Sequence, residues 1–185
     1  LSALIALYRP DSMPFIDTYI DNKHHPEHIH YIHPDMKQIL DSTYGVNIYQ
    51  EQSMKITKIF GGRSDAGADR MRKCLAKKKP EKVKEETDLL HKEILNNGYS
   101  RKVADYICEE FAEKGGYNFN ASHSQAYAVI CLQTAYLKAH HPLAFFKAML
   151  NLNKTKVGKV NKIMVDARSF DIQILPPSIN RSGMD

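Results

Sequence analysis

Cysteine is scarce in this sequence, and long apolar runs are missing. The 185 residues include three cysteines, Cys74, Cys108 and Cys131, which lie far apart and form no C-x-x-C pair. This spacing excludes a disulfide scaffold and predicts reduced thiols on core helices of a cytoplasmic protein. No apolar run approaches the ~20 residues that a membrane span needs. Residues 1–7 are too short and lack the basic flank of a signal peptide.

Motifs of the common catalytic classes are also missing. The sequence has no P-loop, no G-x-G-x-x-G and no G-x-S-x-G. No carboxylate pair stands on a predicted strand ready to hold Mg²⁺. Cys131, which a Cys/His nucleophile pair would need, falls on the most apolar predicted helix. We therefore expect no catalytic residue and no metal site in this chain, which has the composition of a binding module.

The composition is that of a folded, basic protein. Hydrophobic residues make up 43% and charged residues 25%, which excludes intrinsic disorder and collagen. Lysine and arginine number 26 against 21 acids, giving a net charge of +5 and a pI near 9.0. This excess favours a polyanionic partner. The length suits one large domain or two small ones.

Apolar residues recur at helical spacing through most of the chain, and glycine or proline separates the segments. The pattern predicts a mainly α protein, with a multi-helix domain over residues 1–150. Residues 46–49 are strand-like. Residues 151–185 are expected to form a small αβ tail, in which a linker, a short helix and a strand over residues 172–175 lead toward a next domain. Residues 1–7 resemble the middle of a helix without a cap, so we expect a piece of a longer protein.

Six cations gather within ten residues at the end of a helix predicted between Ser64 and Ala76: Arg70, Arg72, Lys73, Lys77, Lys78 and Lys79. Arg70, Lys73 and Lys77 are spaced to share one helix face. Arginine can bind phosphate oxygens through two hydrogen bonds, while lysine supplies a point charge. The cluster fits an anion site, although a solvated helix face followed by a basic loop would look the same.

A polar turn over residues 118–124 precedes the most apolar helix, predicted over residues 125–140. Its hydroxyls, amides and free backbone N–H groups could bind an anion at the helix N-terminus. His123 adds a donor whose charge changes near neutral pH. Tyr127 follows one turn later, so the two rings would share a ridge suited to stacking on a base pair. The alternative is N-capping by Ser122 or Ser124, with Tyr127 in the core.

Three other groups are ambiguous from the sequence. The histidines at positions 24, 25, 28, 30 and 33 suggest zinc, but their loop-like stretch lacks the spacing of a zinc site and favours a polar connector. Arg9 lies between Tyr8 and Pro10, where it could form a structural ion pair or contact a phosphate or the template. Gln50 and Glu51 could cap a helix or accept a hydrogen bond.

Several motifs, taken together and in order, resemble the fingers domain of the bacterial C-family replicative DNA polymerases, the alpha subunits of DNA polymerase III. They are ALYRP (6–10), YIHP (31–34), TYGVNIYQEQ (43–52), the stretch from Ala68 to the three lysines at 77–79, FNASHS (119–124) and QTAYLKAHHP (133–142). ILPPSIN (174–180) matches the segment that follows the fingers in this family. The resemblance covers nearly the whole chain, from Ala6 to about residue 182.

The resemblance implies a role in nucleotidyl transfer during DNA replication, as part of a DNA-directed DNA polymerase. In such enzymes the fingers close over the incoming dNTP and the templating base. Arg72 and Lys73 would lie near the triphosphate or the primer-template backbone, with Lys77 and Lys78 in support. The ridge formed by His123, Ser124 and Tyr127 would pack on the nascent base pair.

The resemblance also implies which parts of the enzyme lie elsewhere. A palm domain outside these residues would bind the catalytic Mg²⁺ through aspartates, so the 185 residues alone should be inactive. The expected partners are primer-template DNA, dNTP and the other domains of the same polymerase chain. The sliding clamp and other replisome subunits would bind through regions outside these residues, in the cytoplasm and away from any membrane.

The sequence departs from the family pattern at a few positions. Asp11 and Ser12 replace a usual Gly-Pro, Lys73 replaces a second arginine, Ala121 replaces a common lysine, and Gly67 replaces a capping-box glutamate. These changes indicate a divergent member. The alternative function is a free-standing basic helical adaptor for an acidic protein or RNA, against which the uncapped start and the lack of an obvious end argue.

Overall fold

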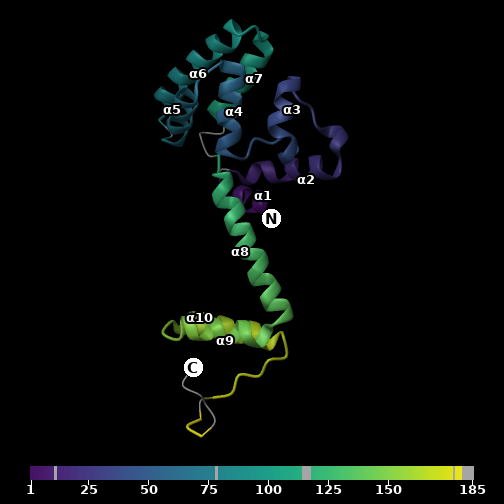
Figure 1. Cartoon of the computed structure of the whole chain (residues 1–185), viewed down its shortest axis with the longest axis vertical. Helices are drawn as coiled ribbons and strands as arrows, with labels where there is room; N and C mark the ends of the chain where they lie inside the picture. Colours follow the sequence, from purple (N-terminus) through teal and green to yellow (C-terminus); the bar gives the residue numbers. More distant parts are fainter. Residues whose placement is uncertain (11, 78, 114–117, 177, 181–185) are drawn as a thin grey trace. The chain divides into compact units, whose positions relative to one another are not determined.

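The computed structural model describes residues 1–10, 12–77, 79–113, 118–176 and 178–180, and helices dominate them (Figure 1). The mainly α fold predicted from the sequence is confirmed. The α-helices are α1 (Ser2–Leu7), α2 (Ile16–His24), α3 (Pro34–Leu40), α4 (Gln50–Gly61), α5 (Asp65–Ala76), α6 (Pro80–Asn96), α7 (Arg101–Glu113), α8 (Ala121–His140), α9 (Pro142–Asn153) and α10 (Val157–Arg168). Short 3₁₀ turns cover Met13–Phe15, Pro26–His28 and Asp41–Thr43.

The chain divides into two compact units, residues 1–128 and 129–185, and the division falls inside α8. The domain boundary predicted after residue 150 stays a prediction. In the structure α9 runs through that position to Asn153.

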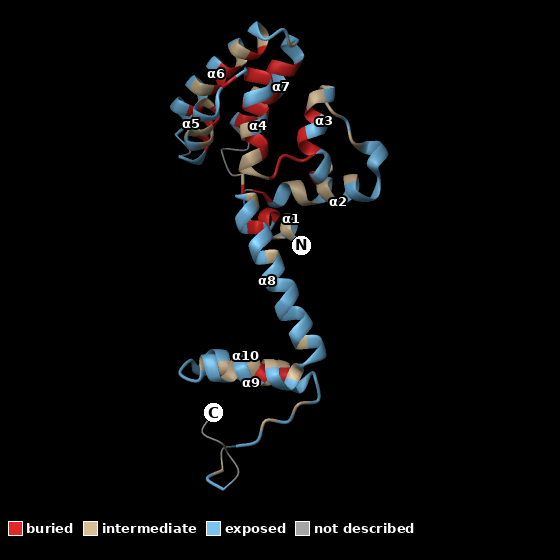
Figure 2. Cartoon of the chain, viewed as in Figure 1, coloured by how far each residue is buried: buried red, intermediate tan, exposed pale blue. Residues whose placement is uncertain are grey.

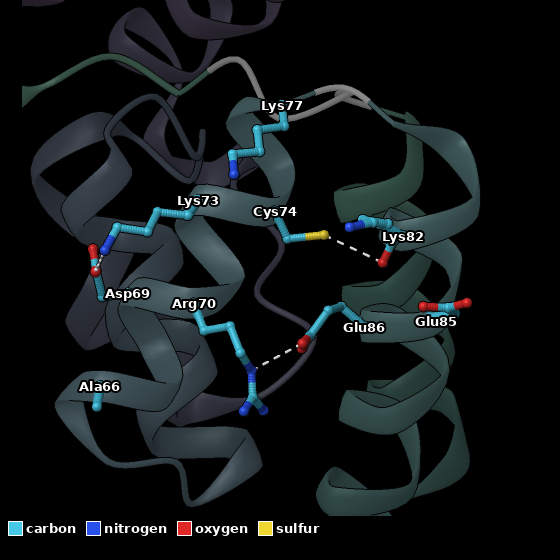
Figure 3. A pocket seen from close by; sticks show the side chains of 9 residues that line it. All are labelled: Ala66, Asp69, Arg70, Lys73, Cys74, Lys77, Lys82, Glu85 and Glu86. Atoms are coloured by element: carbon cyan, nitrogen blue, oxygen red, sulfur yellow. Dashed lines mark hydrogen bonds and ion pairs between the residues drawn. The ribbon is translucent and has the colours of Figure 1, made fainter.

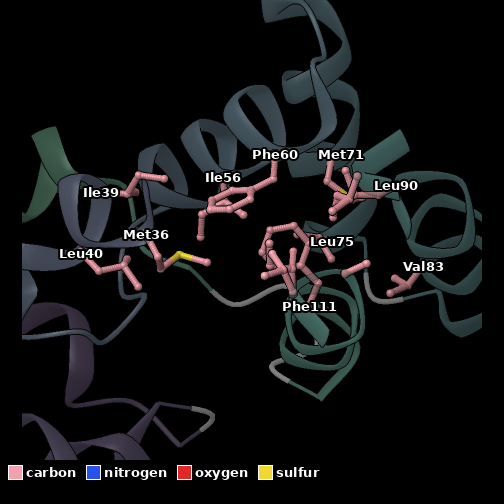
Figure 4. Packing of buried hydrophobic residues seen from close by; sticks show 14 residues of the cluster. Met36, Ile39, Leu40, Ile56, Phe60, Met71, Leu75, Val83, Leu90 and Phe111 are labelled. Carbon is pink, nitrogen blue, oxygen red and sulfur yellow. The ribbon is translucent and has the colours of Figure 1, made fainter. Parts of the chain in front are cut away.

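The main core of the first unit lies among α3, α4, α5, α6 and α7 (Figure 2). Fourteen buried residues form it, and they lie at helical spacing on the inward face of each helix (Figure 4): Met36, Ile39, Leu40, Ile56, Phe60, Met71, Leu75, Val83, Leu90, Ile94, Val103, Ala104, Ile107 and Phe111. On α7, residues 103, 107 and 111 form one buried apolar stripe. Burial of these side chains supplies most of the drive for folding this unit.

Capping and glycine geometry set the helix boundaries around α4 and α5. Gly62 ends α4 with φ of +65°, in the left-handed region that glycine adopts without strain. The Ser64 hydroxyl then accepts a hydrogen bond from the backbone N–H of Gly67 and caps α5. A Cβ added at Gly61 would lie 2.5 Å from the Leu90 side chain, so glycine lets α4 approach α6 closely.

A second, smaller core joins distant segments of the first unit. Its buried members are Ala6, Leu7, Val46, Ile48 and Phe119. The backbone N–H of Phe119 donates to the Ile48 carbonyl at 2.9 Å, and the N–H of Gln50 donates to the Phe119 carbonyl at 2.9 Å. These bonds form a single parallel bridge between Tyr49 and Phe119. The strand-like stretch 46–49 therefore contributes one bridge instead of a sheet strand.

The second unit consists of the rest of α8 with α9 and α10. Phe146 and Ala167 are buried, and Lys138 binds Asp166 at 2.7 Å. The prediction of a strand at 172–175, and with it the αβ tail, is wrong. These residues form no strand, and the described part of the chain has no other strand with which they could pair. A β-strand needs the backbone groups of a partner to satisfy its own. Among the described residues, no helix combines the length and apolarity needed to cross a membrane.

Candidate functional site

The cations of α5 are bound to acids in the structure. The carboxylate of Asp69 binds Arg72 Nη2 at 2.7 Å and Lys73 Nζ at 2.8 Å. These hydrogen bonds, that of Lys73 first and that of Arg72 second, hold the pKa of Asp69 below its usual value. Arg70 Nε lies 2.9 Å from the carboxylate of Glu86 on α6. A phosphate that bound these side chains would compete with an internal acid.

A cavity of about 560 Å³ lies between α5 and α6 (Figure 3). Arg70, Lys73 and Lys77 all line it, so the shared face predicted from their spacing is confirmed. Its other charged lining residues are Asp69, Lys82, Glu85 and Glu86. The lining therefore carries four cations and three acids. Arg72 is not among the lining residues, and Lys78 lies outside the described residues.

Arg63 anchors this region, and the sequence reading missed it. Its side chain is only 4% exposed, and its guanidinium donates to Glu93 at 2.6 Å and to Glu86 at 2.7 Å. Burial alone would lower the pKa of Arg63, but the hydrogen bonds to the two glutamates outweigh it and raise the pKa. Glu86 thus joins the buried Arg63 to the exposed Arg70. The one available signal was a single arginine between Gly61-Gly62 and the α5 cap.

A second cavity, of about 240 Å³, also reaches the C-terminal end of α5. Ala76 lines this cavity, whereas the next residue, Lys77, lines the first one. The remaining lining residues are Arg9, Gln50, Asn118, Phe119, Asn120 and His123. The structure therefore brings together two residues that the sequence singled out separately, Arg9 and His123.

The Arg9 guanidinium and three rings contact one another in succession. We call this set the aromatic row: Arg9, Phe119, His123 and Tyr127. The Arg9 guanidinium carbon lies 4.2 Å from the centre of the Phe119 ring. The Phe119 and His123 ring centres are 5.5 Å apart, and those of His123 and Tyr127 are 4.6 Å apart. The predicted ridge of His123 and Tyr127 is therefore present. Tyr127 is 52% exposed, so the alternative that placed it in the core is wrong.

The N-terminus of α8 differs from both predictions made for it. Asn120, and not Ser122 or Ser124, caps the helix: its side-chain oxygen accepts from the backbone N–H of His123 at 2.8 Å. The helix accordingly begins at Ala121, four residues earlier than predicted. The carboxylate of Glu51 accepts from the backbone N–H of Ala121 at 3.0 Å, so an acid of the chain itself already fills the expected anion position.

Ser124 has a packing role in the structure. Its side chain is fully buried, and its hydroxyl donates to the Ser2 carbonyl at 2.5 Å. The hydroxyl groups of Ser2 and Ser124 also lie 2.8 Å apart. These contacts fasten the first turns of α8 to α1.

The histidine stretch behaves as a connector in the structure. His28 binds Asp21 at 2.8 Å, His25 stacks on His28 with ring centres 5.0 Å apart, and the His33 ring caps α3 through the backbone N–H of Asp35. Among the described residues there is no group of three or more His, Cys, Asp or Glu side chains arranged to hold a metal.

The sequence predicted all three cysteines in the core, and for Cys131 this prediction is wrong. Cys131 is exposed, because the face of α8 that carries it is uncovered, and Cys74 and Cys108 are half-buried. Burial raises the pKa of the Cys108 thiol to about 12 and also raises that of Cys74. These two thiols are therefore protonated at neutral pH.

Comparisons with known proteins point to one family. Residues 1–98 match the family model for the bacterial DNA polymerase III alpha subunit finger domain. DNA polymerase III subunit alpha is 41% identical over 97% of the chain in Campylobacter jejuni, 41% over its full length in Caulobacter vibrioides, and 42% over 98% of it in Borreliella burgdorferi. The chain spans about 15–16% of the length of these relatives. The chain therefore belongs to the bacterial DNA polymerase III alpha subunit family and contains its finger domain.

Proposed function

We propose that this chain binds the incoming dNTP and the primer-template DNA during template-directed nucleotidyl transfer, as the fingers of a DNA polymerase. The observation that carries the proposal is the aromatic row, in which an arginine and three rings lie in sequence beside a cavity. Family membership favours this function over a free-standing adaptor for an acidic protein or RNA.

The row supplies the two kinds of contact that a nucleotide needs. An arginine fork can bind two phosphate oxygens at once. Aromatic faces stack on bases of any sequence, each worth about 1–3 kcal/mol. The cavity, about 240 Å³, is smaller than the roughly 300–1,000 Å³ typical of a pocket for a whole drug-sized ligand. We therefore expect it to take one part of the nucleotide, with Arg9 toward the phosphates and His123 and Tyr127 toward the base pair.

The α5 cations would add to the attraction for phosphate. Lys73 and Lys77 line the neighbouring cavity, and Arg72 would act by exchanging Asp69 for a phosphate oxygen. Placed cations stabilise the negative charge that develops on a leaving pyrophosphate. Lys78, which lies outside the described residues, would support them.

The family implies catalytic Mg²⁺, and the described residues of this chain do not fit it, since they offer no cluster of metal ligands. We propose that a palm domain elsewhere in the full-length polymerase binds the metal. The 185 residues alone should then add no nucleotide to a primer. The sliding clamp and other replisome subunits would contact other regions of the full-length protein, in the cytoplasm.

The test uses a full-length alpha subunit that carries this segment, assayed by primer extension. Replacing Arg9 by alanine should raise KM for dNTP about tenfold, because a hydrogen bond to a charged group is worth about 1.5–3 kcal/mol. The KM of Arg9→Lys should lie between those of the parent and of Arg9→Ala, since lysine keeps the charge and lacks the two-pronged guanidinium. Arg101→Ala is the matched control, because it removes the same charge from an exposed position of the same unit.

DNA binding is measured in parallel at several salt concentrations. Each lost phosphate contact should reduce the slope of log affinity against log salt by about 0.9 for duplex DNA. His123→Ala and Tyr127→Ala should weaken binding with little change in that slope, because stacking is not a charge effect. Equal KM values and equal slopes for Arg9→Ala and Arg101→Ala would refute the proposal.

A further inference from the structure

Glu51 connects the first turns of two helices that are far apart in the sequence. It is the second residue of α4, and its side chain is half-buried. One carboxylate oxygen accepts from the side-chain amide of Asn120 at 2.9 Å, and the other accepts from the backbone N–H of Ala121 at 3.0 Å. Both oxygens are thus used to hold the start of α8.

The position is favourable for a negative charge. The first backbone N–H groups of a helix have no partner within the helix, and the helix dipole places partial positive charge there. Glu51 lies within the first turn of its own helix and binds the first turn of α8, so both dipoles stabilise the same carboxylate.

Asn120 links this contact to the aromatic row. Its amide nitrogen donates to Glu51, while its amide oxygen caps the backbone N–H of His123. The carboxylate therefore fixes which way the Asn120 amide points, and that orientation keeps the α8 cap in place. His123 and Tyr127 project from the turns that follow.

We propose that Glu51 is a positioning residue of the nucleotide site: by holding Asn120 and Ala121, it keeps His123 and Tyr127 in line with Phe119 and Arg9. This inference rests on the proposed function of the aromatic row as the binding surface for the nucleotide and the base pair. Glu51 itself need not touch the nucleotide.

The sign of the effect separates positioning from simple electrostatics. Glu51 is an acid close to a surface that would bind a polyanion. If its charge were all that mattered, removing it would strengthen the binding of dNTP. If its contacts position the row, removing them should weaken binding, because part of the population would no longer present the rings correctly.

The first experiment compares Glu51→Gln with Glu81→Gln in a full-length alpha subunit that carries this segment. Glu81 is the matched control, since it is exposed and is also the second residue of its helix, α6, so both variants lose one first-turn charge. Glu51→Gln should raise KM for dNTP about three- to tenfold, with kcat changed less than twofold. Hydrogen exchange of the amides at residues 121–124 should accelerate by a similar factor only in Glu51→Gln.

The second experiment exchanges the two partners. Both partners of Glu51 are donors, so the NH₂ group of Glu51→Gln faces either the Asn120 NH₂ group or the Ala121 N–H. Asn120→Asp alone places two carboxylates together. The double variant Glu51→Gln/Asn120→Asp restores a donor–acceptor pair, with the new amide donating to the new carboxylate, which still caps the His123 N–H. We expect each single variant to raise KM for dNTP and the hydrogen exchange rates of amides 121–124. The double variant should return both quantities to within about twofold of the parent.

The outcomes are distinguishable. Exchange and KM equal to those of Glu81→Gln, or a lower KM in Glu51→Gln, would overturn the positioning role. A double variant no better than the worse single variant would overturn it as well. If His123→Ala leaves KM and DNA affinity unchanged, the proposed function of the row fails at that residue. The hydrogen exchange rates of amides 121–124, and their return toward the parent value in the double variant, would still decide whether Glu51 holds the start of α8.

Discussion

Arg63 and Arg70 contact the same glutamate from environments of opposite exposure, which makes a matched test of buried against exposed ion pairs. The side chain of Arg63 is 4% exposed and that of Arg70 is 60% exposed, and both bind Glu86. Arg63 also binds Glu93, and its stem packs on Gly67, where an added Cβ would lie 3.1 Å from the Arg63 side chain.

We expect Arg63→Ala to lower the free energy of unfolding by about 3 kcal/mol. Breaking a buried ion pair costs about 3–5 kcal/mol, and the lower end applies because Glu86 keeps Arg70 and both glutamates retain some contact with solvent. Arg70→Ala should cost about 0–1 kcal/mol, as exposed pairs do.

Urea unfolding of the 185-residue chain, followed by circular dichroism, measures both variants. In a chain of this length, 3 kcal/mol corresponds to a fall in Tm of roughly 6–12 °C. An unchanged m-value with a lower midpoint would show a loss of stability without a change in the surface exposed on unfolding. Equal losses for the two variants, or a loss below about 1 kcal/mol for Arg63→Ala, would refute the view that Arg63 and its two glutamates hold the connection between α4 and α5 against α6.

Three other outcomes can be checked with simpler measurements. Phe60→Ala should cost about 3–5 kcal/mol in urea unfolding, because the ring is fully buried in the main core; a loss under 1 kcal/mol would contradict that core. The hydrogen bond to Asp21 raises the pKa of His28 above 6.5, so NMR titration should find it there and Asp21→Asn should return it toward 6.5. The stability that this histidine contributes is present below pH 6.5 and is lost as the pH rises through its folded pKa; an unchanged pKa in Asp21→Asn would rule the pair out. A thiol reagent at neutral pH should modify the exposed Cys131 first and Cys108 slowly, since burial raises the pKa of Cys108 to about 12; mass spectrometry of the labelled peptides decides the order.

Local patterns in the sequence were enough to predict most of the helices. Ser64 and the pair Gly61-Gly62 mark the limits of α4 and α5, because capping and left-handed geometry depend on residues within one turn. The spacing of His123 and Tyr127 predicted their shared ridge for the same reason. Signals of this kind are complete within four or five residues.

Features that depend on a distant partner could not be predicted. Residues 172–175 have the composition of a strand, but a strand forms only where another backbone pairs with it. The α8 cap moved to Asn120, which Glu51 orients from 69 positions away in the sequence. Arg9 and Phe119 are separated by 110 positions, and nothing in either local sequence announces their contact.

The seam between residues 47–53 and 118–121 has a consequence for the order in which the molecule assembles. Its hydrogen bonds join positions about 70 residues apart, and Ser124 meets Ser2 across 122 positions. The main core contains no residue of this seam, and its most extensive helix contacts, between α4 and α5 and between α6 and α7, join helices that follow one another in sequence. Because non-local contacts must first overcome the entropy of closing a long loop, the seam should close last in folding and open first in native-state fluctuations. The aromatic row would then come apart and re-form while the helical core stays folded.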